Sequence, residues 1–218
     1  MPGEGGTDWV AWHTDYDDPS SDLSWRRRAV QSAVRCSLDE AGSEPFRIVS
    51  ACSGDGRDLL EVLATHAAAA RTQVRLLELD DRLARRAEDF ARDHGLEGVE
   101  VVRSDAGCTD SYAGAVPADL VLLCGVFGNL SDEDVQATVG VARQLCTAGG
   151  TVVWTRGRFF DRDPVEPTDE IRVWFDRAGF EEVSLDAPEH RSYRVGVHRF
   201  LGEPELLVPG RRFFTFTR

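Results

Sequence analysis

The first half of the chain holds residues whose types and spacing suit the binding of a polar organic ligand. Gly54 and Gly56 follow a short apolar run at 46–49, and Arg57 opens a segment with helical spacing. Glycine can adopt positive φ and let a ligand lie against the backbone, and the first amides of the following helix favour an anionic group. Glu78 follows this turn by about twenty residues, which is the spacing of a ribose-binding acid. An ionised carboxylate offers only acceptors and therefore suits a vicinal diol.

The glycine turn fails two common patterns. A dinucleotide fingerprint needs a third glycine where this chain has Leu59, and a phosphate-binding loop needs a lysine that is absent. The stretch instead resembles motif I of the class I S-adenosylmethionine (SAM) methyltransferases, an acidic residue followed by x-G-x-G-x-G. The chain departs from that motif twice, with Ser50 at the acidic position and Cys52 at the first glycine. A purely structural strand-to-helix turn in another α/β protein is the alternative interpretation of this stretch.

Other stretches resemble the same family in the same order. Residues 78–80, before a helix expected at 81–94, resemble motif II, whose acid receives the ribose hydroxyls. Asp105 and Ala106 follow an expected strand at 99–103 and match the position where the family binds adenine. Residues 125–130 follow a near-continuously apolar strand expected at 118–124, and Gly149-Gly150 precede a strand expected at 151–155. Both stretches resemble the corresponding parts of the family.

The resemblance implies SAM as methyl donor and S-adenosylhomocysteine (SAH) as product, without a metal ion. The methionine carboxylate is expected near the amides of residues 53–56, with a charge added by Arg26. The cofactor-binding residues that it implies are Tyr16, Arg26, Ala51, Cys52, Ser53, Gly54, Asp55, Gly56, Glu78, Leu79, Asp105, Ala106, Cys124, Gly125, Val126 and Phe127.

The acceptor and the catalytic groups are less constrained. Methyl transfer from a sulfonium to N, O or C depends mainly on alignment and exclusion of water, and a base is needed only where the acceptor loses a proton. Asn129 is expected to position the acceptor or to stabilise a turn. Arg156 and Arg158 are expected either to bind an acidic acceptor or to be solvated. The candidate bases are His13, Tyr16 and His198.

Composition limits the partners. The chain has 218 residues, which suits one large domain, and its net charge of −13 disfavours nucleic acid and anionic membranes as partners. Its five cysteines show no metal-ligand spacing and are typical of a reducing cytoplasm. No signal-peptide pattern or membrane-spanning apolar run is visible. We expect a cytoplasmic monomer or homodimer with a small-molecule acceptor.

The order of elements predicts the fold. It is a Rossmann-like three-layer α/β sandwich with a mostly parallel seven-stranded sheet and an antiparallel last strand. Residues 1–42, an aromatic segment and a helix, are expected to form a lid or to cover a sheet edge, and 43–218 form the SAM-binding domain. Residues 212–217 are expected as the last strand, and 193–201 as an extra strand or pocket wall.

The predicted function is therefore SAM-dependent methylation of a small molecule. A methyltransferase with a protein acceptor and a catalytically silent SAM-binding interaction protein are alternatives. An α/β protein that uses NAD is a further alternative, which the missing third glycine disfavours.

Overall fold

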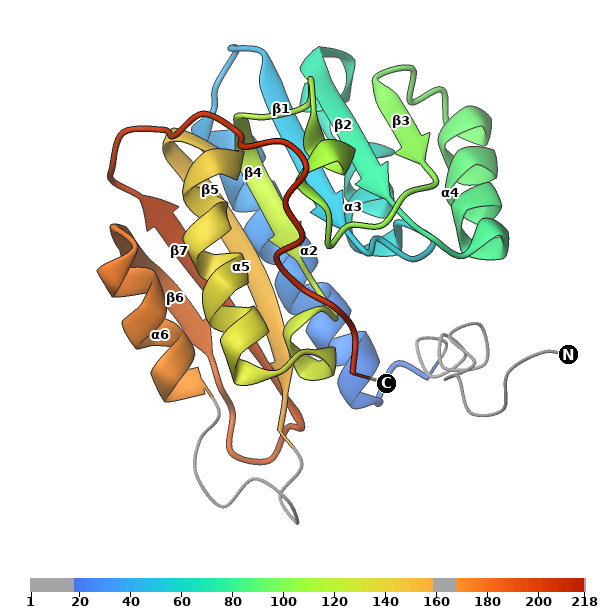
Figure 1. Cartoon of the computed structure of the whole chain (residues 1–218). Coiled ribbons are helices and arrows are strands. Elements are labelled where there is room, and N and C mark those ends of the chain that lie inside the picture. The colour runs from blue at the N-terminus through green and yellow to red at the C-terminus, as the bar shows by residue number, and fades with distance from the viewer. Residues whose placement is uncertain (1–17, 159–167, 218) are drawn as a thin grey trace, which may run out of the picture.

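A seven-stranded sheet forms the middle layer of the protein in the computed structural model, which describes residues 18–158 and 168–217. The strands lie in the order β3-β2-β1-β4-β5-β7-β6 (Figure 1). Neighbouring strands are parallel except at β7, which runs antiparallel to both β5 and β6. The strands are β1 (Phe46–Ala51), β2 (Thr72–Leu77), β3 (Val99–Val102), β4 (Ala118–Leu123), β5 (Cys146–Gly157), β6 (Phe180–Asp186) and β7 (Tyr193–Phe200).

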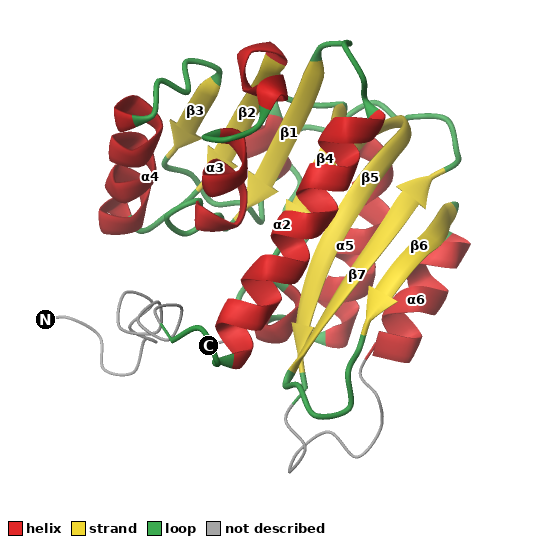
Figure 2. Ribbon diagram, turned by 180° about the vertical axis from the view of Figure 1, so that it is seen from behind, coloured by secondary structure: helices red, strands yellow, loops and turns green. Residues whose placement is uncertain are grey.

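Helices cover both faces of the sheet. The helices α2 (Asp22–Glu40), α3 (Arg57–Leu63) and α4 (Asp81–Asp93) lie on one face, and α5 (Asp132–Leu145) and α6 (Thr168–Arg177) on the other (Figure 2). Short 3₁₀ turns occur at η2 (Ala67–Arg71), η3 (Thr109–Tyr112) and η4 (Phe127–Asn129). None of the helices in the described ranges is both long and apolar enough to span a bilayer. The predicted three-layer sandwich is confirmed.

Polar caps fix where the helices begin at the carboxyl edge of the sheet. The Asp80 carboxylate accepts the backbone N–H groups of Arg82 and Leu83 at the start of α4. The Ser131 hydroxyl accepts the N–H of Asp134 at the start of α5. Such caps satisfy amides that have no partner within the helix. The loops before these helices are therefore held in place beside the strand ends.

The core consists of two apolar clusters, one on each face of the sheet. Trp154 of β5 is the largest fully buried side chain in the described ranges, and it packs against Phe127 and Phe175 on the α5 and α6 side. Gly196 of β7 lies directly against its indole, because a Cβ built there would come within 2.3 Å of the ring. The antiparallel β5–β7 pair is thus packed around one large residue.

The prediction for the last strand is wrong. Residues 193–201 supply β7, whereas 212–217 do not join the sheet and make only an isolated bridge between Arg212 and Cys108. The place beside β5 is already filled by β7, so the tail bonds to loops instead. We call residues 207–217 the C-terminal strap; it runs beside α5 and ends at the carboxyl edge of the sheet (red in Figure 1).

The helix expected within a lid, α2, packs on the sheet face against α3, β5 and β7. The buried face of α2 includes Val30, Val34 and Leu38. Residues 1–17, with the aromatic segment, lie outside the described ranges. The division at residue 42 into a lid and a binding domain therefore stays a prediction.

Candidate active site

A cavity of about 690 Å³ opens at the carboxyl edge of the sheet. It lies where the strand order reverses between β1 and β4, the place where open α/β sheets bind ligands. Loops after β1, β2, β3 and β4 line it, together with the start of α3, the end of β5, Arg26 of α2, Tyr193 of β7 and the C-terminal strap. Its volume lies within the range of small-molecule sites, roughly 300–1,000 Å³.

Cys52 lies in the turn after β1 at a position where the backbone favours glycine. Cys52 has φ 50°, and Gly54 and Gly56 also have positive φ. The backbone therefore adopts at Cys52 the left-handed conformation that glycine adopts freely, and the side chain stands at a strained position. Burial raises the pKa of the Cys52 thiol, with Glu78 and Asp105 adding to the shift. Cys52, at the place of the first motif glycine, thus has a glycine-like backbone conformation.

Gly56 shows why the turn needs a residue without a side chain. A Cβ at this position would come 2.7 Å from Leu60 and 3.0 Å from Leu76. The turn residues 52–56 all line the cavity, so their backbone forms part of its wall. Ala51, which was expected to contact the cofactor, is buried in the core and does not line the cavity.

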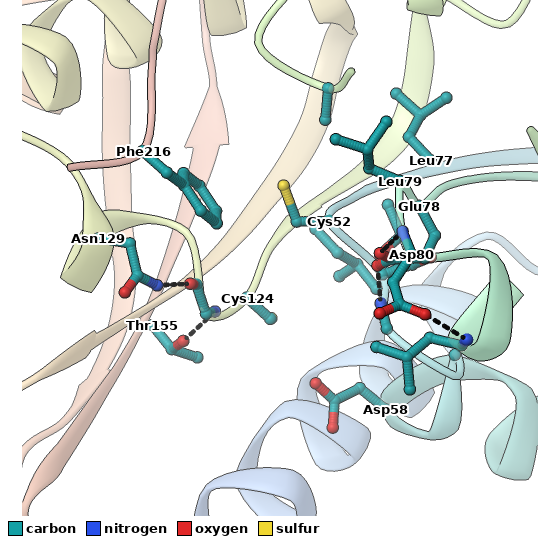
Figure 3. A pocket seen from close by; sticks show the side chains of 18 of the residues that line it. Cys52, Asp58, Leu77, Glu78, Leu79, Asp80, Cys124, Asn129, Thr155 and Phe216 are labelled. Atoms are coloured by element: carbon teal, nitrogen blue, oxygen red, sulfur yellow. Dashed lines mark hydrogen bonds between the residues drawn. The ribbon is translucent and has the colours of Figure 1, made fainter. Parts of the chain in front are cut away.

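Glu78 joins the turn after β1 to the tip of β2. One carboxylate oxygen accepts the N–H of Gly54 at 2.7 Å, and the other accepts the N–H of Asp80 at 2.7 Å. The residue is 9% exposed; burial raises the pKa of Glu78, and these backbone hydrogen bonds oppose the rise. Leu79, beside it, is 70% exposed and lines the cavity (Figure 3).

Asp105 and Ala106 line the cavity beyond β3, where they were expected. One oxygen of Asp105 accepts the N–H of Gly107 at 2.8 Å. The other lies 2.8 Å from the guanidinium of Arg212, a residue of the strap. This ion pair could not be predicted from the sequence, because it joins positions more than a hundred residues apart.

Arg26 reaches the cavity from α2 and meets a carboxylate that the sequence analysis missed. Arg26 is 3% exposed, lies 3.5 Å from Asp58 and stacks over the ring of Tyr193 at 5.5 Å. Burial raises the pKa of Asp58, and Arg26 opposes that rise. The Oδ1 atom of Asp58 is buried and has no hydrogen-bond partner among the described residues. The position of Asp58, two residues after Gly56 in the first turn of the helix, could have indicated this carboxylate from the sequence.

The loop after β4 and the end of β5 form an uncharged part of the wall. Cys124 and Gly125 line the cavity as expected; the N–H of Gly125 donates to the Thr155 hydroxyl at 2.8 Å. Asn129 also lines it, and its side-chain amide donates to the carbonyl of Gly125 at 2.7 Å (Figure 3). Asn129 thus stabilises the turn, one of the two roles left open for it.

Phe127 and Val126 do not line the cavity, contrary to expectation. Both are fully buried, and the Phe127 ring centroid lies 5.8 Å from that of Trp154. The 3₁₀ turn η4 directs this ring into the core between the sheet and α5. Among the described residues, the aromatic side chains at the cavity are instead Tyr193 and, from the strap, Phe214 and Phe216.

The other candidates lie elsewhere. Arg156 and Arg158 do not line the cavity; side chains alternate along β5, so Thr155 and Gly157 face it instead. His198 is 1% exposed and accepts a hydrogen bond from Trp154 at 3.1 Å, away from the cavity. The candidates His13 and Tyr16 lie outside the described residues. Within the described ranges, no cluster of His, Cys, Asp and Glu could hold a metal ion.

Comparison with known proteins places this fold. No family model matches the chain, and no curated protein sequence is significantly similar to it. Magnesium protoporphyrin IX methyltransferase from Synechocystis PCC 6803, solved with bound SAM, aligns with TM-score 0.64 and 14% identity, over 91% of this chain and 86% of that one.

Two further solved structures are similar. An O-methyltransferase family protein from Burkholderia thailandensis aligns with TM-score 0.61 and 18% identity, over 82% of this chain and 58% of that one. A fibrillarin pre-rRNA processing protein from Methanococcus jannaschii aligns with TM-score 0.56 and 16% identity, over 74% of this chain and 69% of that one. The chain therefore has the fold of the class I SAM-dependent methyltransferases.

Proposed function

We propose that the protein is a SAM-dependent methyltransferase that acts on a small-molecule acceptor. The observation that carries this proposal is the position of Glu78, a largely buried carboxylate that bonds to the glycine turn at the reversal of strand order. The solved structures with this fold include one with bound SAM and one with bound SAH.

The residues present fit the nucleoside part of SAM. Glu78 holds the ribose hydroxyls through the acceptor capacity that its two backbone hydrogen bonds leave. Asp105 accepts the adenine amino group, and Ala106 offers its backbone amide to the ring. Leu79, exposed at the rim, covers one face of the base.

The residues also fit the methionine part. Arg26 attracts the carboxylate, and the buried Oδ1 of Asp58, which has no described partner, accepts from the ammonium group. The turn residues 53–56 line the cavity beside this pair, so their backbone lies within reach of the same end of the ligand. Paired opposite charges at this end of the cavity therefore match a zwitterion.

When bound, SAM supplies a methyl group that is already activated by the sulfonium. The chain's own contribution is to hold the acceptor in line and to exclude water. The described lining residues of β5 and of the loop after β4 include no histidine or carboxylate. His13 and Tyr16 stay candidate bases for an acceptor that must lose a proton.

A calorimetric titration with SAM, SAH and NAD tests the proposal. We expect micromolar binding of SAM and SAH and no binding of NAD. Methyl transfer from radiolabelled SAM to a pool of small molecules then distinguishes an enzyme from a silent SAM-binding protein. Transfer to protein but not to small molecules would indicate the protein-acceptor alternative. Absence of SAM and SAH binding would refute the assignment altogether.

A further inference from the structure

The cavity has two parts of different chemistry. The charged side chains among its described lining residues come from α2, α3, the loops after β1, β2 and β3, and Arg212. The part that we call the acceptor half is lined by residues of 124–129 and 155–157 and by Thr215 and Phe216. Its described lining side chains carry no charge. They are the phenyl ring of Phe216, the amide of Asn129, the hydroxyls of Thr155 and Thr215, and the thiol of Cys124.

Two hydrogen bonds join uncharged polar groups of the acceptor half to one another. The Asn129 amide donates to the carbonyl of Gly125, and the N–H of Gly125 donates to Thr155. These groups offer little to compensate a charged molecule for the water that it loses on entry. Because burying an uncompensated charge is costly, the acceptor half favours an uncharged molecule.

Phe216 gives this half a fixed aromatic surface. On one side of it in the chain, the N–H of Thr215 donates to the carboxylate of Asp134 at 2.9 Å. On the other side, the N–H of Thr217 donates to the carbonyl of Asn129 at 2.8 Å. The Phe216 ring stacks with that of Phe214, at 5.9 Å between centroids. In Figure 3 it projects between Asn129 and Cys52.

We propose that Phe216 is a specificity-determining residue that stacks against the acceptor, and that the acceptor is a flat, uncharged aromatic molecule. This inference rests on the proposed function, since it assumes that the nucleoside occupies the half that contains Glu78. Offset stacking requires a planar partner, so a saturated molecule of the same size gains less from the ring. The strap holds the ring in place before any ligand arrives, which lowers the entropic cost of binding.

The test uses the full chain saturated with SAH and three probes of similar size. The probes are 2-naphthol, its saturated analogue decahydro-2-naphthol, and the charged 6-hydroxy-2-naphthoate. Affinities are measured by saturation-transfer NMR titration. We expect 2-naphthol to bind three- to tenfold more tightly than the saturated analogue, and the carboxylate to bind more weakly than 2-naphthol. Equal affinities for the flat and saturated probes, or no naphthol binding, would overturn the proposal.

Variants assign the effect to the ring. Phe216→Leu keeps apolar volume but removes the plane, so it should abolish the preference for naphthol and leave SAH affinity within twofold. Phe216→Tyr keeps the plane and should retain that preference even if the leucine variant is unstable. Leu206→Ala, at a position 91% exposed in the same tail, is the matched control and should change nothing.

The outcomes separate this inference from the proposed function. If Phe216→Leu lowers the affinity for SAH as much as the affinity for 2-naphthol, the ring covers the nucleoside and the acceptor assignment is wrong. If wild-type protein binds no SAH, the proposed function fails, and naphthol titration without SAH then reports on the ring alone.

Discussion

The carboxylate of Glu78 accepts the backbone N–H of Gly54 at 2.7 Å, so the acid that follows β2 fixes the turn that follows β1. A second bond from the N–H of Asp80, also 2.7 Å, orients the same carboxylate from its own loop. Both bonds need an oxygen that only accepts. A change at Glu78 therefore alters the shape of the turn as well as the group offered to a ligand.

Replacing Glu78 by glutamine tests this double role. The new NH₂ group would face one of two backbone N–H donors, so one buried bond is lost whichever way the amide is turned. Hydrogen bonds to charged groups contribute about 1.5–3 kcal/mol each, so SAH affinity measured by calorimetry should fall about 10- to 100-fold. Glu97→Gln, at an exposed turn before β3, is the control. Unchanged affinity in folded Glu78→Gln would refute the ribose assignment.

Asp105 and Arg212 allow the adenine assignment to be separated from the ion pair. Asp105→Asn should weaken SAH about tenfold, because a charged acceptor for the amino group is lost. Arg212→Gln should leave SAH affinity within about threefold, because the pair is about half exposed and exposed pairs contribute about 0–1 kcal/mol. Calorimetry of both variants decides. Equal losses would mean that the ion pair, rather than the carboxylate alone, supports the base.

The sequence predicted the first five strands well because each carries a strong local signal. β4 is a near-continuous apolar run before Gly125, and β1 and β2 become mostly apolar toward their carboxyl ends, as parallel strands buried on both faces do. The last strand was misplaced because 193–200 and 212–217 both alternate partly in polarity. Only pairing with β5, which is non-local, chooses between them.

The site was predictable where the backbone determines it and unpredictable where side-chain direction determines it. Glu78 and Asp105 follow strand ends, and strand ends meet at one edge of a parallel sheet. Phe127 follows a strand end too, but the 3₁₀ turn η4 rotates it into the core, and no sequence pattern encodes that rotation. Phe216 reaches the cavity only because the strap returns along the rim.

Gly196 should be intolerant of any side chain. A Cβ there would lie 2.3 Å from the indole of Trp154, which is fully buried and has no room to move aside. Overpacking of a core costs about 1–3 kcal/mol, so Gly196→Ala should lower the free energy of unfolding by at least that amount. Gly140→Ala in α5, where nothing lies within 4 Å, should instead stabilise by up to about 1 kcal/mol. Urea unfolding of the pair would contradict this packing if both variants gained stability.

His198 should make stability depend on pH. Burial lowers the pKa of His198 from 6.5 to about 4, Glu182 opposes this fall, and Arg172 adds to it. Between these values the unfolded chain binds a proton that the folded chain does not. Stability is therefore complete above pH 6.5 and falls as the pH drops toward 4, by up to about 3 kcal/mol.

His198→Asn tests the pH effect because asparagine does not titrate but retains an acceptor for the Trp154 indole. Urea unfolding at pH 7.5, 6 and 5 should show a smaller loss of stability on acidification in this variant than in wild type. His190→Asn, at an exposed turn, should behave as wild type. Parallel pH profiles for wild type and His198→Asn would rule out the buried imidazole as the source.

Arg26 and Asp58 should be energetically coupled, because both side chains are largely buried and each compensates the charge of the other. Arg26→Met leaves the buried Asp58 carboxylate without its opposite charge. Breaking a buried ion pair in this way lowers the free energy of unfolding by about 3–5 kcal/mol. Burial raises the pKa of Asp58 and Arg26 opposes that rise, so without Arg26 the folded state loses stability as the pH rises above the unfolded pKa of the carboxyl. The loss should therefore be greater at pH 8 than at pH 5. Arg26→Met with Asp58→Asn should recover at least about 1 kcal/mol of the free energy of unfolding relative to Arg26→Met alone. If the two substitutions are simply additive in urea unfolding, the two side chains do not stabilise each other, and their joint role at the methionine end loses its basis.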